Sequence, residues 1–365
     1  MVAPHITPPQ ALTLADYEAQ SREKLEPGIW AYFSGGAADE FTLRRNTEAW
    51  QNMELWPRVL RQLAGGHTRV NLAGREIAHP ILLAPVAHQK LAHPDGELAS
   101  ALAAAAQGAG YVLSTQSSTP LEAVARAVQG DPGRGPLWFQ LYWQHDRVFN
   151  LELAQRAHAA GYESLVLTAD APVSGARDRE RKSGFRLPPG IGSVHLQNLP
   201  SPAHLPTDTY CGGLPAHALC WDDIAWLQER TRLPIWIKGV LHPLDAQQAQ
   251  RMEVAGVIVS NHGGRTLDTA PTTLRALPLI AKALGGTLPL IVDGGIRRGT
   301  DVLKALALGA DAVLIGRPMV HGLAVEGALG VARVIRLLRD ELEIAMALTG
   351  CRTLAEATPG LLTPS

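Results

Sequence analysis

The sequence has little cysteine, almost no excess of charge and no long apolar run. Three cysteines in 365 residues, Cys211, Cys220 and Cys351, are too few and too irregularly spaced for a disulfide framework or a zinc site. With 33 basic and 34 acidic residues the formal net charge is −1, which favours neither nucleic acid nor an acidic membrane surface as a partner. No stretch of 18 apolar residues occurs, so we expect no membrane-spanning helix.

The first ten residues lack the basic start and apolar centre of a signal peptide. We therefore expect a reduced, cytoplasmic protein, and no metal site. Hydrophobic residues make up 46% of the chain, which is enough to build a large core. The length fits one α/β barrel with additions.

Eight short apolar segments recur along the chain, and each ends in polar residues or glycine. Most are rich in Val, Ile and Leu without alternation, as in strands buried on both faces of a parallel sheet. Helical patterns separate most of them, so the sequence predicts a (β/α)8 TIM barrel, with an open doubly wound sheet as the alternative. The expected strands are Ile81–Val86, Tyr111–Gln116, Leu137–Trp143, Ser164–Asp170, Pro234–Val240, Gly256–His262, Pro289–Gly295 and Ala312–Arg317. The expected helices are Gly96–Gln107, Pro120–Gln129, Arg147–Ala159, Pro243–Ala255, Thr272–Leu284, Thr300–Leu308 and Val325–Leu348.

Two segments fall outside this repeat, although we expect one domain over residues 1–365 with the barrel at 81–350. Residues 1–80 contain two helical patterns, Thr13–Glu26 and Ala37–Glu48, and predict an N-terminal helical cap. Residues 171–233 follow the fourth strand and are rich in proline, with Pro188, Pro189, Pro200, Pro202 and Pro206 among them. A loop of this length in a compact domain is usually functional, and it leaves the face where barrel active sites lie.

Polar residues gather where the predicted strands end. Buried polar groups cost free energy unless they have partners, so a full ring of them is hard to explain by structure alone. The set is Ser114, Gln140, Tyr142, Thr168, Asp170, Lys238, Ser260, His262, Asp293 and Arg317.

The loops after the seventh and eighth strands predict a phosphate site. Asp293–Thr300 (DGGIRRGT) runs into a helix, and Gly316–Pro318 ends the last strand. Glycines let a phosphate approach backbone N–H groups, a helix start adds a positive dipole end, and each loop adds a guanidinium. Tight turns with solvated arginines are the alternative interpretation of either loop alone.

The segment Ser260–Arg265 (SNHGGR) predicts a general base beside an anion clamp. Histidine titrates near neutral pH, and arginine binds a carboxylate through two hydrogen bonds. His262 alone could also be a hydrogen-bonded rim residue. Lys238 has three possible roles: a Schiff-base lysine, a cation beside a flavin, or a structural ion pair. Arg177 begins a charged run that would otherwise suggest a solvated face.

From about Tyr17 to Arg352 the chain resembles the FMN-dependent 2-hydroxy-acid oxidases and dehydrogenases, which act on acids such as glycolate, lactate, mandelate and hydroxymandelate. Many ordered motifs carry the resemblance, which makes it specific. They are Tyr32–Ala37, Ala84–Ala87, His93–Glu97, Phe139–Tyr142, Thr168–Asp170, Lys238–Gly239, Ser260–Arg265, Asp293–Gly295 and Gly316–Pro318.

The resemblance implies a role for each matching residue. His262 would take a proton from the substrate and Asp170 would stabilise the protonated imidazole. Arg177, Arg265 and Tyr32 would hold the substrate carboxylate, and Tyr142 would hydrogen-bond the substrate. Lys238 would stabilise negative charge on FMN. The remaining FMN-binding residues would be Ala84, Pro85, Val86, Ala87, Ser114, Gln140, Thr168, Ser260, Asp293, Gly294, Gly295, Arg297, Gly316 and Arg317.

Three positions depart from the glycolate-oxidising members, which have an aromatic residue at Gln116 and often Thr at Val86 and Met at His88. We expect these positions near the side chain of the substrate. Gln116 should leave room for more than a methyl group, which favours an (S)-2-hydroxy acid with a larger or aryl side chain.

The electron acceptor implied by the resemblance is oxygen, with a quinone-type acceptor as the alternative, and the implied assembly is a homotetramer. A Schiff-base aldolase built on Lys238, a non-catalytic FMN-binding protein and another type of FMN barrel are rival functions. The aldolase would leave His262, Arg265 and Arg177 without a joint role.

Overall fold

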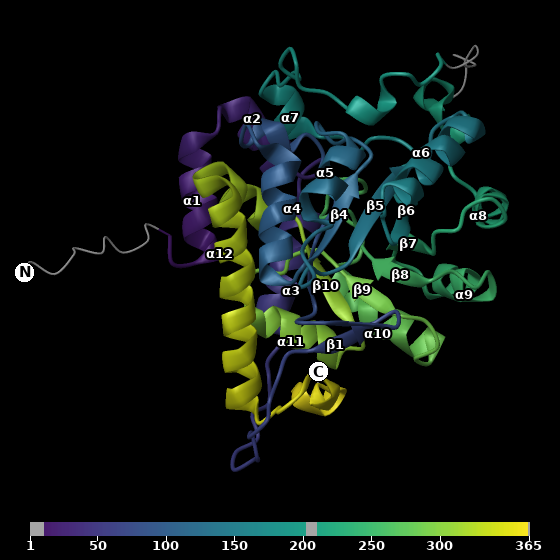
Figure 1. Ribbon diagram of the computed structural model, residues 1–365. Coiled ribbons are helices and arrows are strands. Elements are labelled where there is room, and N and C mark those ends of the chain that lie inside the picture. Colours follow the sequence, from purple (N-terminus) through teal and green to yellow (C-terminus); the bar gives the residue numbers. More distant parts are fainter. Residues whose placement is uncertain (1–10, 202–209, 364–365) are drawn as a thin grey trace, which may run out of the picture.

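The structure, a computed structural model, describes residues 11–201 and 210–363, and its centre is a closed barrel of eight parallel strands (Figure 1). Each strand pairs with its neighbours in chain order, and the last pairs with the first. The predicted (β/α)8 barrel is therefore confirmed, and the open sheet is wrong. The strands are β3 (Ile81–Leu83), β4 (Gly110–Ser114), β5 (Leu137–Tyr142), β6 (Ser164–Thr168), β7 (Ile235–Val240), β8 (Gly256–Val259), β9 (Leu290–Val292) and β10 (Ala312–Ile315).

Helices surround the barrel and follow the predicted alternation. Pro202, Pro206 and the first ten residues lie outside the described residues. The surrounding helices are α4 (Gly96–Gln107), α5 (Leu121–Val128), α6 (Arg147–Ala159), α8 (Trp221–Gln228), α9 (Pro243–Arg251), α10 (Thr273–Leu284), α11 (Gly299–Ala307) and α12 (Arg317–Thr349).

The segment predicted as one loop, residues 171–233, contains helical elements instead. A short helix, α7 (Asp178–Lys182), stands above the barrel, and α8 occupies the regular place of the fourth barrel helix (Figure 1). The backbone N–H of Cys220 donates to the Asp223 carboxylate at 3.0 Å and starts α8, which buries Ile224 and Leu227. The proline-rich composition of the segment hid this short amphipathic pattern. Two 3-10 turns, Val194–Leu196 and Tyr210–His217, lie between α7 and α8.

Helix α12 begins earlier than predicted, directly after β10, and is kinked. Gly327 has φ +59, and the carboxylate of Glu326 beside it accepts a hydrogen bond of 2.8 Å from the hydroxyl of Tyr17. We expected no helix that could span a membrane. Judged by its length and mean hydropathy alone, α12 is long enough and apolar enough to do so. However, 67% of its apolar window is buried, and it packs against α1, α4 and α11 as a core helix.

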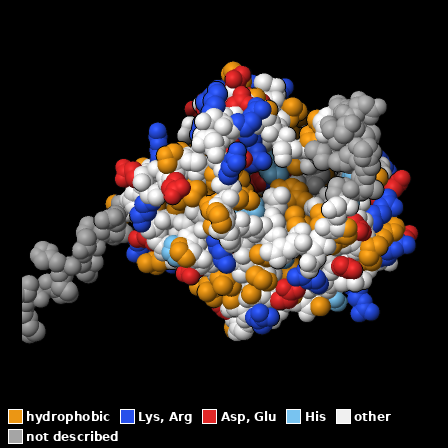
Figure 2. Space-filling model, turned by 90° about the horizontal axis from the view of Figure 1, so that it is seen from above, with side chains coloured by type: hydrophobic (Ala, Val, Ile, Leu, Met, Phe, Trp, Pro, Cys, Tyr) orange, Lys and Arg blue, Asp and Glu red, His pale blue; other side chains and the backbone are white. Residues whose placement is uncertain are grey.

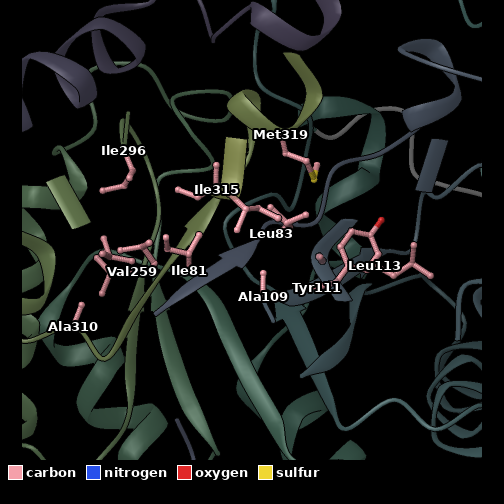
Figure 3. Packing of buried hydrophobic residues seen from close by; sticks show 14 of the residues in the cluster. Ile81, Leu83, Ala109, Tyr111, Leu113, Val259, Ile296, Ala310, Ile315 and Met319 are labelled. Atoms are coloured by element: carbon pink, nitrogen blue, oxygen red, sulfur yellow. The ribbon is translucent and has the colours of Figure 1, made fainter. Parts of the chain in front are cut away.

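The core has two shells on either side of the barrel wall. Inside the barrel, the rings of Trp138 and Trp236 lie 4.8 Å apart and fill the space below the strand ends. Outside, Leu83 and Ile315 of neighbouring strands point together towards Met319 of α12 (Figure 3). These packed side chains fix the strand ends that carry the polar ring.

The N-terminal segment covers both ends of the barrel. Its helices are α1 (Leu14–Lys24), α2 (Pro27–Ser34) and α3 (Phe41–Asn52), of which α2 was not predicted. Sequence analysis also missed a hairpin, which is formed by β1 (Val70–Leu72) and β2 (Arg75–Ile77). Its buried Leu72 and Ile77 join the interior of the barrel. Strands of three residues are too short to give a periodic signal.

We predict that a buried histidine makes the fold acid-sensitive. His79 is fully buried, its Nε2 lies 2.9 Å from the Gln107 carbonyl, and burial lowers its pKa to about 4. Between pH 6.5 and pH 4 the unfolded chain binds a proton there that the folded chain does not, so stability falls as the pH falls, by up to about 3 kcal/mol. Urea unfolding of His79→Gln should show a smaller loss between pH 7 and pH 4.5 than the native chain. Equal losses in both proteins would contradict this account.

Candidate active site

A cavity of about 260 Å³, open to solvent, lies at the carboxyl ends of the barrel strands. Figure 2 looks onto this face, which is hollowed near its centre and carries basic side chains along one edge of the hollow. The expected site residues that line the cavity are Tyr32, Ala84, Pro85, Val86, Ala87, Ser114, Gln116, Tyr142, Thr168, Arg177, Lys238, His262, Arg265, Asp293, Gly294, Gly295, Arg297, Gly316 and Arg317. Gln140, Asp170 and Ser260 lie behind this wall and contact the residues that form it.

His262 is held between an acid and a phenol. Its Nδ1 lies 2.9 Å from the Asp170 carboxylate, and its Nε2 lies 3.1 Å from the Tyr142 hydroxyl. A carboxylate can only accept, so Nδ1 carries the hydrogen and the Nε2 lone pair accepts from Tyr142. Burial would raise the pKa of Asp170, but the charge and hydrogen bond of His262 hold it below its usual value. Nε2 is therefore an oriented base facing the cavity.

Two backbone features bring these groups together. His262 has φ +57, and the two glycines after it are also left-handed, so the chain turns the imidazole back over the barrel. Such strain is typical of functional sites. Gly239 has φ +106, and a Cβ there would lie 2.5 Å from the Cβ of Asp170. Only glycine lets Asp170 approach β7 closely enough to face His262.

Lys238 is a buried cation with its own partners. Its Nζ lies 3.1 Å from the Asp293 carboxylate and donates to the Ser260 hydroxyl at 2.8 Å. Burial would lower the pKa of Lys238, but Asp293 and Asp170 more than offset this and raise it. The second carboxylate oxygen of Asp293 is buried without a partner among the described residues. The lysine is thus a fixed positive charge, and Asp293 can still accept a hydrogen bond from a ligand.

Three half-buried arginines give the cavity its charge. Arg265, Arg297 and Arg317 form no ion pair with any carboxylate in the described part of the chain. Burial lowers the pKa of all three, and at Arg317, where the other two add repulsion, to about 9. Unpaired charges that are partly shielded from water are costly, so this arrangement calls for anionic ligands.

Arg265 and Arg317 are held by the backbone of the N-terminal segment. Arg265 Nη1 donates to the carbonyls of Tyr32 (2.7 Å) and Gly35 (2.9 Å), and its guanidinium lies 5.5 Å from the centre of the Tyr32 ring. Arg317 donates to the carbonyls of Phe33, Gly35 and Gly263. Burial raises the pKa of Tyr32, so its hydroxyl stays protonated. The end of α2 and the glycine after it therefore orient both guanidinium groups.

Helix α3 supports the glycine loops, a role that sequence analysis missed. Asn46 and Asn261 exchange two side-chain hydrogen bonds of 2.8 Å, and Trp50 Nε1 donates to the Gly294 carbonyl at 2.8 Å. A Cβ at Gly295 would lie 2.3 Å from the Asn46 carbonyl oxygen. No sequence signal links α3 to these loops, because the contacts join residues more than 200 positions apart.

Val86, His88 and Gln116 were expected near the side chain of the substrate, and two of them line the cavity. Val86 and Gln116 line the cavity, but His88 does not. His88 is 5% exposed, and its backbone N–H donates to the Gln116 carbonyl at 3.1 Å. It has a left-handed φ of +52, and its ring lies 6.2 Å from the ring of Tyr32, so the expectation that it faces the substrate stays a prediction.

The cavity fits a cofactor that carries a phosphate. Arg297 and Arg317 lie beside the glycine loops, and no side chain caps the start of α12 at Gly316. On the opposite wall Gln140 accepts from Ser114 and donates to Thr168, which orders a polar surface for a planar heteroaromatic ring. Lys238 and the free oxygen of Asp293 complete that surface.

The chain matches the FMN-dependent dehydrogenase family over residues 21–364. It is 48% identical over 364 residues to an L-lactate oxidase of Alicycliphilus denitrificans, with 98% of both chains covered. It is 42% identical to a glycolate oxidase of Spinacia oleracea, covering 93% of this chain and 92% of the relative. A crystal structure of mandelate oxidase with benzoyl-formic acid superposes with a TM-score of 0.87 at 38% identity, covering 97% of this chain and 98% of that one.

Proposed function

The chain belongs to the family of FMN-dependent dehydrogenases, and from that premise we propose that it oxidises a small (S)-2-hydroxy acid to the 2-oxo acid. The observation that carries this is the Nε2 lone pair of His262, which faces a cavity lined by half-buried arginines. FMN is the cofactor. Relatives that are named oxidases favour oxygen as acceptor, giving hydrogen peroxide, over a quinone-type acceptor.

FMN would lie across the barrel mouth. Its phosphate would meet Arg297, Arg317 and the backbone of Gly295 and Gly316, and its ring would lie against the Ala84–Ala87 segment. Ser114, Gln140, Thr168 and Ser260 would complete the surface under the ring. Bound FMN supplies the acceptor for the two electrons that leave the substrate.

The residues around the substrate would have separate roles. Arg265 and Arg177, with Tyr32, would hold the carboxylate and so orient the reacting carbon. His262 Nε2 would take a proton from the substrate, and Asp170 would stabilise the imidazolium that results. Tyr142 would hydrogen-bond the substrate. Each of these side chains except Asp170 lines the cavity.

The state of Lys238 argues against the Schiff-base aldolase. A nucleophilic lysine needs a lowered pKa, whereas Asp293 and Asp170 raise the pKa of Lys238 above its ordinary value. A charged ammonium instead suits a place beside a ring that gains negative charge. A non-catalytic FMN-binding protein would have no use for the His262–Asp170 pair.

The substrate side chain, the assembly and the location are further proposals. Val86 and Gln116 line the cavity, and Gln116 is smaller than the aromatic residue of the glycolate-oxidising members, which supports a larger or aryl side chain. Trp56, Val59 and Leu60 are exposed by 55%, 80% and 102% and would be covered in a homotetramer. The cysteines Cys211, Cys220 and Cys351 are all free, which supports a reducing, cytoplasmic location.

The proposed function can be tested by the FMN content of the purified protein and by the loss of flavin absorbance when a 2-hydroxy acid is added. We expect one FMN per chain, released on denaturation, and anaerobic bleaching by (S)-2-hydroxy acids but not by (R) enantiomers. Comparing kcat/KM for glycolate, (S)-lactate, (S)-2-hydroxyoctanoate and (S)-mandelate tests the side-chain proposal. A preference for glycolate would overturn the larger pocket, and a protein that takes up no FMN would overturn the function itself.

A second prediction concerns Arg177 and Arg265, which together form the proposed carboxylate clamp. Arg177→Ala and Arg265→Ala should each weaken 2-hydroxy-acid binding about 10- to 100-fold and FMN binding far less, because a charged hydrogen bond contributes roughly 1.5–3 kcal/mol. Arg181→Ala is the matched control, since Arg181 is 70% exposed and outside the cavity. Unchanged KM in both clamp variants would contradict the assignment.

A further inference from the structure

Glu180 lies beside the carboxylate clamp, and sequence analysis gave it no role. Its Oε2 lies 3.1 Å from Nη1 of Arg177, three residues earlier on the same short helix. The two side chains are 27% and 21% exposed, so the pair is well shielded for a loop position. Apart from Arg177, this oxygen has no partner in the described part of the chain. The arginine lines the cavity, so its counter-ion reaches the edge of the substrate site.

A neighbouring pair on the same helix shows that this geometry is unusual. Arg181 and Asp178 form the same kind of i, i+3 ion pair, but their side chains are 70% and 38% exposed and neither lines the cavity. An exposed pair of that kind contributes little. The Arg177–Glu180 pair differs because its charges also act on two cavity residues. Glu180 raises the pKa of both Tyr32 and Arg265, and Arg177 lowers both.

The segment that carries Glu180 is fixed in place. Arg179 pairs with Glu40 and donates to the hydroxyl of Ser34 at 3.3 Å. A Cβ at Gly175 would lie 2.3 Å from the Arg265 carbonyl oxygen, so the loop packs directly on the strand end that carries Arg265. Glu180 therefore stands at a defined place next to the two clamp arginines.

We propose that Glu180 is a built-in counter-ion of the clamp, whose negative charge weakens the hold on a substrate or product carboxylate and so speeds release of the 2-oxo acid. The inference rests on the proposed function. With Arg177 and Arg265 the clamp would carry two positive charges, and Glu180 reduces the sum to one. Arg177 keeps its Nη1 on Glu180, while its other N–H groups remain available to a ligand carboxylate.

The experiment measures ligand affinity in the FMN-loaded enzyme by the change in flavin absorbance when pyruvate or benzoylformate is added. Glu180→Gln keeps an acceptor for Arg177 but removes the charge. We expect pyruvate to bind about three- to tenfold more tightly, with KM lowered and kcat for a slow substrate unchanged. Pyruvamide, which lacks the carboxylate, should bind equally to both proteins. Asp178→Asn is the matched control and should change neither affinity.

A double variant separates charge from helix stability. Arg177→Ala leaves Glu180 unpaired beside the ligand, so Glu180→Gln in that background should recover part of the lost pyruvate affinity. Unchanged or weaker pyruvate binding in Glu180→Gln, or no recovery in the double variant, would overturn the inference while leaving the function intact. A native enzyme that binds no 2-oxo acid would overturn the proposed function and the inference together.

Discussion

His262→Ala is expected to keep FMN and to slow anaerobic bleaching by the best 2-hydroxy acid by about 10²- to 10⁴-fold, the usual cost of losing a general base. The loss should lie in the rate of reduction, because His262 contacts Asp170 and Tyr142 and not the arginines that would hold the phosphate. Stopped-flow measurement at saturating substrate gives this rate directly.

Asp170→Asn offers the graded comparison. An amide at this position can still orient Nδ1 but no longer offsets the charge of the imidazolium, so bleaching should slow less than in His262→Ala. A 2-oxo acid should still bind to both variants, since the clamp arginines are intact. Near-normal bleaching of His262→Ala would show that another group takes the proton.

Lys238→Met is expected to damage both stability and reaction. The substitution leaves the Asp293 carboxylate buried without its cation, and breaking a buried pair in this way costs about 3–5 kcal/mol of the free energy of unfolding. It also removes a fixed positive charge from the cavity wall, which should slow flavin reduction by about 10²-fold or more.

The double variant Lys238→Met with Asp293→Asn tells these effects apart. Removing both charges should restore most of the stability, as measured by urea unfolding, but not the rate of reduction. If the rate recovered with the stability, Lys238 would be only a structural partner of Asp293. If the single variant lost no stability, the Lys238–Asp293 ion pair would contribute nothing to the free energy of unfolding.

The barrel could be predicted because its strands are buried on both faces. Segments such as Ser164–Asp170 have no period other than continuous apolarity, and their polar last residues mark the edge where they meet. The closed topology then brings residues from all eight strand ends to one cavity. This is why residues as distant as Ser114 and Arg317 could be placed in one site.

Other features could not be predicted, either because their elements are short or because they depend on contacts between distant segments. The β1–β2 hairpin has three-residue strands, and α8 lies inside a proline-rich stretch. The supporting role of Asn46 arises from a bond to Asn261 that spans 215 positions. His88 lies outside the cavity lining, and its left-handed φ could not be predicted from its residue type.

The hydrogen bonds from Arg265 and Arg317 to the carbonyls at the end of α2 constrain how the enzyme can be made. They join the first forty residues to the last strands of the barrel over 230 to 284 positions. A nascent chain on the ribosome can form several strands and helices before Arg317 emerges, but it cannot aim this guanidinium. Cofactor capture must therefore wait until translation is nearly complete, and a chain released early would leave the ribosome without the means to hold FMN.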